Sequence, residues 1–186
     1  PAVAMERCHE VTMNMGFTSV RATRNAMHEL KNHDVKRAES IREDERTADR
    51  YEDELGTYLV KLSGCHLSDQ DRVEAAELLH MIGDFERISD HAVNILESTE
   101  ELRGKGIAFT QPAIEEMSKM FGAVDEIMDL ALTAFIHRDL SAAREVEPLE
   151  QVIDKLKDEL RTNHIARLQR GECSLAAGFV LSDLLT

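Results

Sequence analysis

The feature that most constrains the fold is a succession of long amphipathic segments separated by short turns. In each segment apolar residues recur at steps of three and four, which is the spacing of one face of an α-helix. Because short loops make consecutive helices antiparallel neighbours, this pattern predicts helix bundles. The predicted helices span residues 4–32, 35–63, 68–103, 110–137, 140–170 and 174–186.

These segments form two sets of three that align at an offset of 105 residues, which pairs the turn residue Asp34 with Asp139. Amphipathic helices always align to some degree, but acids recurring in the same order favour an internal duplication. We therefore predict an all-α fold of two tandem three-helix bundles, residues 1–106 and 107–186, with the third helix of the second bundle truncated. Other identical pairs are Met15/Met120, Glu45/Glu150, Asp49/Asp154, Asp53/Asp158, Glu54/Glu159 and Leu55/Leu160.

Composition supports helices and argues against several kinds of partner. The chain of 186 residues is 42% hydrophobic but only 4% aromatic, unlike a β-sandwich, which relies on aromatic and β-branched residues. The formal net charge is −14, whereas a protein that binds nucleic acid shows a basic face. The same charge argues against direct adsorption to anionic lipid and favours attraction of cations.

Three widely separated cysteines, Cys8, Cys65 and Cys173, form no Cys-x-x-Cys pair. We therefore expect a reducing compartment, with all three as small buried apolar groups. No apolar run approaches the roughly 20 residues that a membrane-spanning helix needs. Because no glycine-rich phosphate loop or nucleophile motif is present either, we expect no enzymatic activity.

Acidic residues interrupt the apolar faces of the predicted helices. Glu45 and Glu52 lie on the apolar stripe of the second predicted helix, Glu86 on that of the third and Glu150 on that of the fifth. A buried carboxylate needs a cation, a hydrogen-bond network or a proton, because an unpaired buried charge is costly. The simplest partner for Glu86 is a nearby base such as Arg87.

Several of these acids belong to Glu-x-x-x-Asp pairs, whose spacing puts both carboxylates on one helix face about one turn apart. Oxygen-rich clusters of this kind suit hard or octahedral cations, so a divalent or iron-type metal ion is the expected cofactor. Such pairs also arise by chance, and Asp44, Asp49, Asp53 and Glu54 can equally form a mostly solvated acidic face. The candidate metal ligands are Glu45, Asp49, Glu86, Asp90, Glu150 and Asp154.

Two Glu-x-x-His pairs, Glu6/His9 and Glu77/His80, open a different hypothesis. This motif occurs twice in ferritin-like di-metal carboxylate proteins. That reading requires the two pairs to converge in one bundle. A further alternative is a purely structural adaptor, with surface acids, no metal and an apolar groove for partner helices.

The segment 83–95, Gly-Asp-Phe-Glu-Arg-Ile-Ser-Asp-His-Ala-Val-Asn-Ile, resembles the signature of the PhoU family, which lies in the third helix of each three-helix repeat. The stretch 50–59 is similar to the form of PhoU domain found at the C-terminal end of bacterial sodium/phosphate (Na/Pi) cotransporters. The resemblance covers the whole chain, with two repeats and matching helix order. It departs from the family in one respect, since the second copy of the signature is expected after Thr186.

This resemblance implies a negative regulator of phosphate uptake that binds metal through Glu/Asp-x-x-x-Asp motifs, at the six candidate ligands named above. It also implies a domain at the cytoplasmic face of the membrane, with the membrane transport region of the same polypeptide as its partner. A start at Pro1 without a methionine fits such an excised domain. The shortened last helix leads us to expect a homo-oligomer or loose packing, and we expect neither nucleic acid nor lipid as a direct partner of this fragment.

Overall fold

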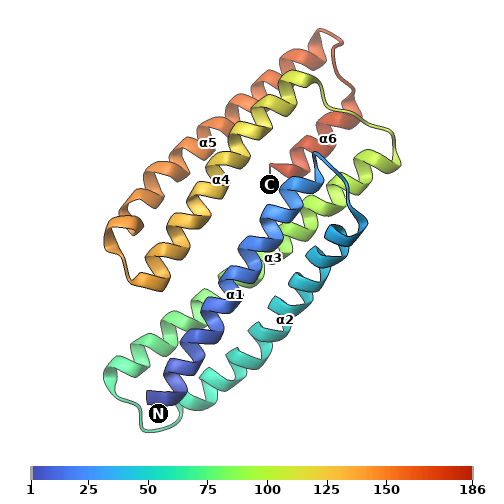
Figure 1. Cartoon of the computed structure of the whole chain (residues 1–186). Helices are drawn as coiled ribbons and strands as arrows, with labels where there is room; N and C mark the ends of the chain where they lie inside the picture. Colours follow the sequence, from blue (N-terminus) through green and yellow to red (C-terminus); the bar gives the residue numbers. More distant parts are fainter. Residues whose placement is uncertain (1, 186) are drawn as a thin grey trace. The chain divides into compact units, whose positions relative to one another are not determined.

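A computed structural model describes residues 2–185 and contains, over that range, six α-helices and no strand (Figure 1). The all-α prediction is confirmed, and within the described residues each predicted helix end lies within a few residues of the observed one. The predicted end at Thr186 lies outside those residues. The largest difference is at the first helix, which ends at Glu29 rather than near residue 32. The helices are α1 Ala2–Glu29, α2 Val35–Ser63, α3 Asp69–Gly104, α4 Gln111–His137, α5 Leu140–Gln169 and α6 Leu175–Leu184.

The turn before α2 and the turn before α5 end in the same N-cap chemistry. The Asp34 carboxylate accepts hydrogen bonds from the backbone N–H groups of Lys36 and Arg37. Asp139, 105 residues later, accepts from Ser141 and Ala142 in the same way. Both aspartates therefore satisfy backbone donors that have no partner inside the helix.

The chain divides into two compact units, Pro1–Leu96 and Glu97–Thr186, and α3 contributes to both. In the first unit α1 and α2 pack side by side as an antiparallel pair (Figure 1). Small alanine side chains make up much of the buried core that these two helices share with α3. One buried cluster comprises Ala22, Ala26, Ala38, Ile41, Ala92 and Leu96.

Buried hydroxyl groups join α1 to α3 in the first unit. Ser19 Oγ donates to the backbone carbonyl of Phe85 at 2.7 Å, and Ser89 Oγ donates to Ser19 Oγ at 2.9 Å. Thr23 Oγ1 donates to the carbonyl of Ile88 at 3.4 Å. Because Ser19 and Ser89 are fully buried, these bonds fix the register of α3 around residues 85–89.

In the second unit α4 and α5 form the corresponding antiparallel pair (Figure 1). The short helix α6 packs against α5. The contact between α5 and α6 is close at Gly178, where an added Cβ would lie 2.7 Å from Nε2 of His164. Burial and the charge of Arg167 lower the pKa of His164, against a smaller opposing effect of Glu116. A side chain at position 178 would collide with His164, so the glycine is needed for lack of space and not for its backbone conformation.

Two expectations about burial are wrong. Glu45, Glu52 and Glu86 are half-buried rather than fully buried, and Glu150 is exposed. Of the cysteines only Cys8 is buried, whereas Cys65 is exposed and Cys173 is half-buried. Cys65 is exposed because it lies in the turn between α2 and α3, outside any helix face that packs on a neighbour.

The acids that are deeply buried in the first unit are Asp44 and Glu29. Asp44, expected on a solvated face, instead pairs with Arg21. The Glu29 carboxylate accepts from the backbone N–H of Asp34 at 3.0 Å and from Arg37 Nη1 at 3.1 Å, and it lies 2.8 Å from Nδ1 of His33. Each buried carboxylate therefore has the partners that its burial demands.

Candidate carboxylate site

The Glu86–Asp90 segment of α3 is held so that its acids face α2. Ser89 lies between the two acids and is anchored to α1 through Ser19. On the α2 side, Gly56 faces α3, since a Cβ there would lie in ordinary contact with Ile82, 3.6 Å from its Cδ1. Ile82 stands one turn before Glu86 in the sequence. The signature segment of α3 thus packs between two neighbours, and its acids come near those of α2.

Glu86 is the centre of a group of carboxylates drawn from both helices. Burial is the largest cause of its raised pKa, followed by the charge of Asp90 and a side-chain hydrogen bond with Asp90. The charges of Glu52 and Asp49 on α2 raise the pKa further. Negative charge therefore accumulates here without full compensation.

Glu45 shows the same effect from the other helix. Burial, then the charges of Asp90 and Asp49, raise its pKa, while Arg46 acts in the opposite direction. Carboxylates whose charges raise the pKa of Glu45 and Glu86 form an arrangement that a proton or a cation stabilises. We call this group of five residues on α2 and α3 the carboxylate cluster: Glu45, Asp49, Glu52, Glu86 and Asp90.

A basic partner for Glu86 is not found within residues 2–185, where no ion pair joins Glu86 to an arginine or lysine. Arg50, another nearby base, instead lies over the ring of Tyr51, with 5.6 Å between the guanidinium carbon and the ring centroid. Arg46 pairs with Glu39 and Glu43 on its own helix, each at 3.1 Å. The carboxylate cluster therefore keeps its excess negative charge.

The carboxylate cluster has suitable donor atoms for a metal ion, but its side chains are not arranged as a metal site. Its oxygen donors are those that hard and iron-type cations take. In the part of the chain that the structure describes, however, no three Asp, Glu, His or Cys side chains converge closely enough to hold a metal ion. Metal binding by Glu45, Asp49, Glu86 and Asp90 therefore stays a prediction.

The remaining predicted pair, Glu150 and Asp154, lies on the exposed face of α5. No hydrogen bond or ion pair joins either residue to another helix within the described residues. The structure thus brings four of the six predicted ligands together and leaves these two apart. Glu52 is the member of the cluster that was not among the predicted ligands. Its position on the apolar stripe of α2 was the sequence feature that could have indicated it.

The ferritin-like hypothesis gains no geometric support. Glu6, Glu77 and His80 are exposed, so they do not face a bundle interior. The absence of a converging set of ligands among residues 2–185 applies to them as well.

Comparison with known proteins accounts for both the fold and the repeat. A model of the PhoU domain family matches residues 12–99 and 117–185, two segments that begin 105 residues apart. A protein of Thermotoga maritima described as "Phosphate-specific transport system accessory protein PhoU homolog 1" is 28% identical over 103 residues, which are 55% of this chain and 44% of that protein. A Clostridium acetobutylicum "Phosphate-specific transport system accessory protein PhoU homolog" is 24% identical over 158 residues, 82% of this chain and 69% of that protein.

A solved structure has the same fold over nearly the whole chain. It is titled "Crystal structure of the phosphate transport system regulatory protein PhoU from Streptococcus pneumoniae" and superposes with a TM-score of 0.85. The alignment covers 99% of this chain and 86% of that chain at 16% sequence identity. No helix among residues 2–185 combines the length and apolar character that crossing a membrane requires.

Proposed function

Because the chain belongs to the PhoU domain family, we propose that it is a regulatory module of a phosphate transport system rather than an enzyme. The single observation that carries this proposal is the family match, which covers both repeats and includes the Glu86–Asp90 segment of the carboxylate cluster. The relatives carry the description of accessory proteins of phosphate-specific transport, and this chain spans 44% and 69% of their lengths.

We also propose a more specific setting, in which the domain adjoins the transport region of a sodium/phosphate cotransporter at the cytoplasmic face of the membrane. Support comes from the likeness of segment 50–59 to the PhoU domains of those transporters. In this setting the domain modulates the transport region to which it is joined. Expression of that transporter with and without the domain tests the idea, because unchanged phosphate uptake in both forms would contradict it.

Cation binding by the carboxylate cluster is the proposed signal. Glu45 and Asp49 from α2 and Glu86 and Asp90 from α3 are the proposed ligands of a divalent or iron-type cation. When bound, such a cation supplies positive charge that offsets the mutual repulsion of these side chains. The raised pKa values of Glu45 and Glu86 support the proposal. For Glu150 and Asp154, the corresponding pair of the second repeat, only the repeat itself supports a ligand role.

The mechanism follows from where the charges lie. With the cluster uncompensated, repulsion between α2 and α3 opposes their packing, whereas a cation or proton removes this repulsion. The contact of α1 with α3 through Ser19 and Ser89 stays unaffected, because neither residue carries charge. Occupancy of the cluster would therefore adjust how firmly α2 packs on α3, and a transporter that contacts this face could sense it.

Elemental analysis of the protein purified without chelator tests the cation. We expect bound metal in the parent protein and its loss in Glu86→Gln/Asp90→Asn, which keeps side-chain size. The control variant Glu77→Gln/Asp53→Asn removes the same number of charges from exposed positions of α3 and α2 outside the cluster and should retain the metal. Equal metal content in all three proteins, or none in any, would count against these ligands.

The adaptor alternative keeps one point of support, since it expects an apolar groove and the second unit contains one. It predicts no metal in the same experiment.

A further inference from the structure

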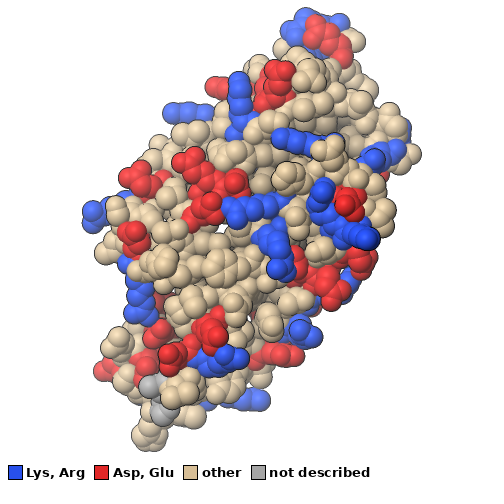
Figure 2. Space-filling view, viewed as in Figure 1, with Lys and Arg blue, Asp and Glu red and all other residues tan. Residues whose placement is uncertain are grey.

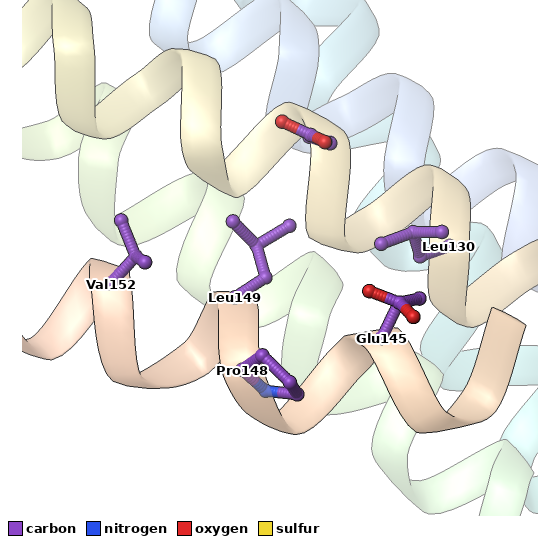
Figure 3. Close-up of a pocket in the computed structure, with 6 residues that line it drawn as sticks. Leu130, Glu145, Pro148, Leu149 and Val152 are labelled. Atoms are coloured by element: carbon purple, nitrogen blue, oxygen red, sulfur yellow. The ribbon is translucent and has the colours of Figure 1, made fainter.

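The second unit has a hollow of about 330 Å³ between α4 and α5 (Figure 3). It lies along the first half of α5, a dozen or more residues before His164, where α6 packs. Pro148 stands inside α5 at this point and supplies no backbone N–H to the helix. We call this hollow the α4–α5 groove. Its lining residues are Glu126, Leu130, Glu145, Pro148, Leu149 and Val152.

The α4–α5 groove combines an apolar lining with acidic walls. Leu130, Leu149 and Glu145 project into the space between the two helices (Figure 3). Val152 is 45% exposed, so apolar surface here meets solvent. Glu126 and Glu145 contribute one carboxylate from each helix, and neither has a hydrogen bond or ion pair within residues 2–185. Acidic and basic side chains both occur on the face of the molecule that Figure 2 shows.

The first unit shows how the equivalent place is filled. At the repeat offset of 105, Arg21 corresponds to Glu126 and Asp44 to Leu149. Arg21 reaches from α1 to α2, with Nη2 2.6 Å from Oδ1 of Asp44 and Nε 3.1 Å from Oδ2. The Asp44 side chain is 7% exposed and the Arg21 side chain 62%, so the arginine covers the carboxylate from the solvent side. The first repeat thus closes this position with its own cation.

The second repeat has the reverse chemistry at the same place. A carboxylate, Glu126, stands where the first repeat has the arginine, and a leucine stands where it has the aspartate. An internal ion pair is therefore impossible between these two positions. The missing component is a cation with an apolar stem, which an arginine or lysine side chain supplies.

We propose that the α4–α5 groove is the docking site of an amphipathic helix of a partner protein, which inserts an arginine side chain between Glu126 and Glu145. The aliphatic stem of the arginine packs on Leu130 and Leu149, and apolar residues one turn away on the partner helix cover Pro148 and Val152. Arginine fits better than lysine because its planar fork donates to two carboxylates at once. This inference does not depend on cation binding by the carboxylate cluster.

Two synthetic helical peptides with the same leucine positions test this docking site. One carries arginine and the other glutamate at the positions flanking the leucines, and binding to the whole chain is followed by fluorescence anisotropy. We expect the arginine peptide to bind in a salt-dependent manner and the glutamate peptide to show no binding. Equal affinity for the two peptides would overturn the proposal, because Glu126 and Glu145 would then not distinguish a basic peptide from an acidic one.

Two variants and a control locate the binding. Glu126→Gln/Glu145→Gln should lower the affinity for the arginine peptide roughly tenfold or more, since charge-assisted hydrogen bonds are lost. The control Glu147→Gln/Glu159→Gln removes two charges from exposed positions of α5 outside the lining and should change affinity little. Equal loss in both variants would assign the binding to net charge and reject the groove.

Exchange of repeat residues gives an independent measurement. Glu126→Arg/Leu149→Asp installs in the second unit the ion pair of the first, and it should abolish peptide binding while the circular dichroism spectrum stays unchanged. Analytical ultracentrifugation of the parent and of this variant measures their oligomeric state, and so tests whether a second copy of the chain occupies the groove. A dimer that the exchange dissolves would overturn the assignment to a different partner protein.

Discussion

Arg167 of α5 holds Glu116 of α4 with both ends of its guanidinium group, Nη1 lying 3.0 Å from Oε1 and Nη2 2.8 Å from Oε2. The arginine side chain is only 6% exposed and that of the glutamate is 24% exposed. Asn163 donates to the same carboxylate at 2.9 Å. This network joins the two long helices of the second unit near α6.

Removal of the arginine should destabilise the second unit. Arg167→Met keeps the apolar volume but leaves the Glu116 carboxylate half-buried with Asn163 as its remaining partner. We expect a loss of about 2 kcal/mol, below the full cost of a buried broken pair because the glutamate keeps some contact with water. Urea denaturation followed by circular dichroism measures it. Arg170→Gln, which removes an exposed ion pair with Glu172, is the control and should leave the midpoint of urea denaturation unchanged.

The same pair predicts a specific response to acid. The hydrogen bond from Arg167 is the main cause that lowers the pKa of Glu116 from its ordinary 4.5. The pair therefore contributes stability above pH 4.5 that is lost as the pH falls through the lower pKa of the folded state. Thermal denaturation between pH 7 and pH 3 should show a larger loss in the parent than in Arg167→Met. Parallel curves would show that the pair does not set the acid response.

The carboxylate cluster should respond in the opposite sense. Because the pKa of Glu86 is raised, the folded state is favoured at acidic pH, and this advantage is lost as the pH rises from 4.5 through the higher pKa of the folded state. In metal-free protein at pH 7, Glu86→Gln should therefore raise stability by a few tenths of a kcal/mol, a small figure because solvent screens half-exposed charges. Glu77→Gln, on an exposed part of α3, should have no such effect. A melting temperature lowered by Glu86→Gln would contradict the repulsion described here.

Loss of the hydroxyl contact between α1 and α3 should loosen the first unit. Ser89→Ala removes the donor to Ser19, and we expect a cost of about 1 kcal/mol for the lost buried hydrogen bond. A double-mutant cycle with Ser19→Ala isolates the pair, because Ser19 also donates to the Phe85 carbonyl. Additive effects of the two substitutions would show that the two hydroxyl groups do not interact.

The close approach of α6 to α5 gives a matched pair of glycine substitutions. Gly178→Ala places a Cβ 2.7 Å from His164 Nε2 and should destabilise the protein by about 1–3 kcal/mol. Gly122→Ala, in α4 with nothing within 4 Å of the added Cβ, should instead stabilise by about 0.5–1 kcal/mol through helix propensity. Stabilisation by both substitutions would contradict this prediction, because it would mean that α6 shifts away from His164 at little cost.

Helix boundaries were predictable from sequence because their signals are local. Asp34 and Asp139 cap the helices that they were expected to precede, and apolar periodicity defined the faces. The sequence placed Glu45 and Glu86 on the apolar stripes of their helices, and the structure finds both half-buried.

Pairing across helices was the part that sequence did not reveal. Asp44 follows Ile41 by three residues and precedes Ala48 by four, so it borders the apolar stripe, yet it was assigned to solvent. Its burial depends on Arg21, a residue 23 positions away on another helix. The partial burial of Glu86 likewise depends on the packing of α3 against its neighbours, which no local sequence pattern reports.

The two aspartate-capped turns also bear on how the chain reaches its native state. Each turn joins two long antiparallel helices, so the contacts between α1 and α2, and those between α4 and α5, connect residues that are near in sequence. Local contacts incur a small loop-closure entropy and form early. Each repeat can thus nucleate its own helical hairpin without waiting for the other. We therefore expect folding to begin independently in the two helical hairpins, with α3 and α6 packing on them later.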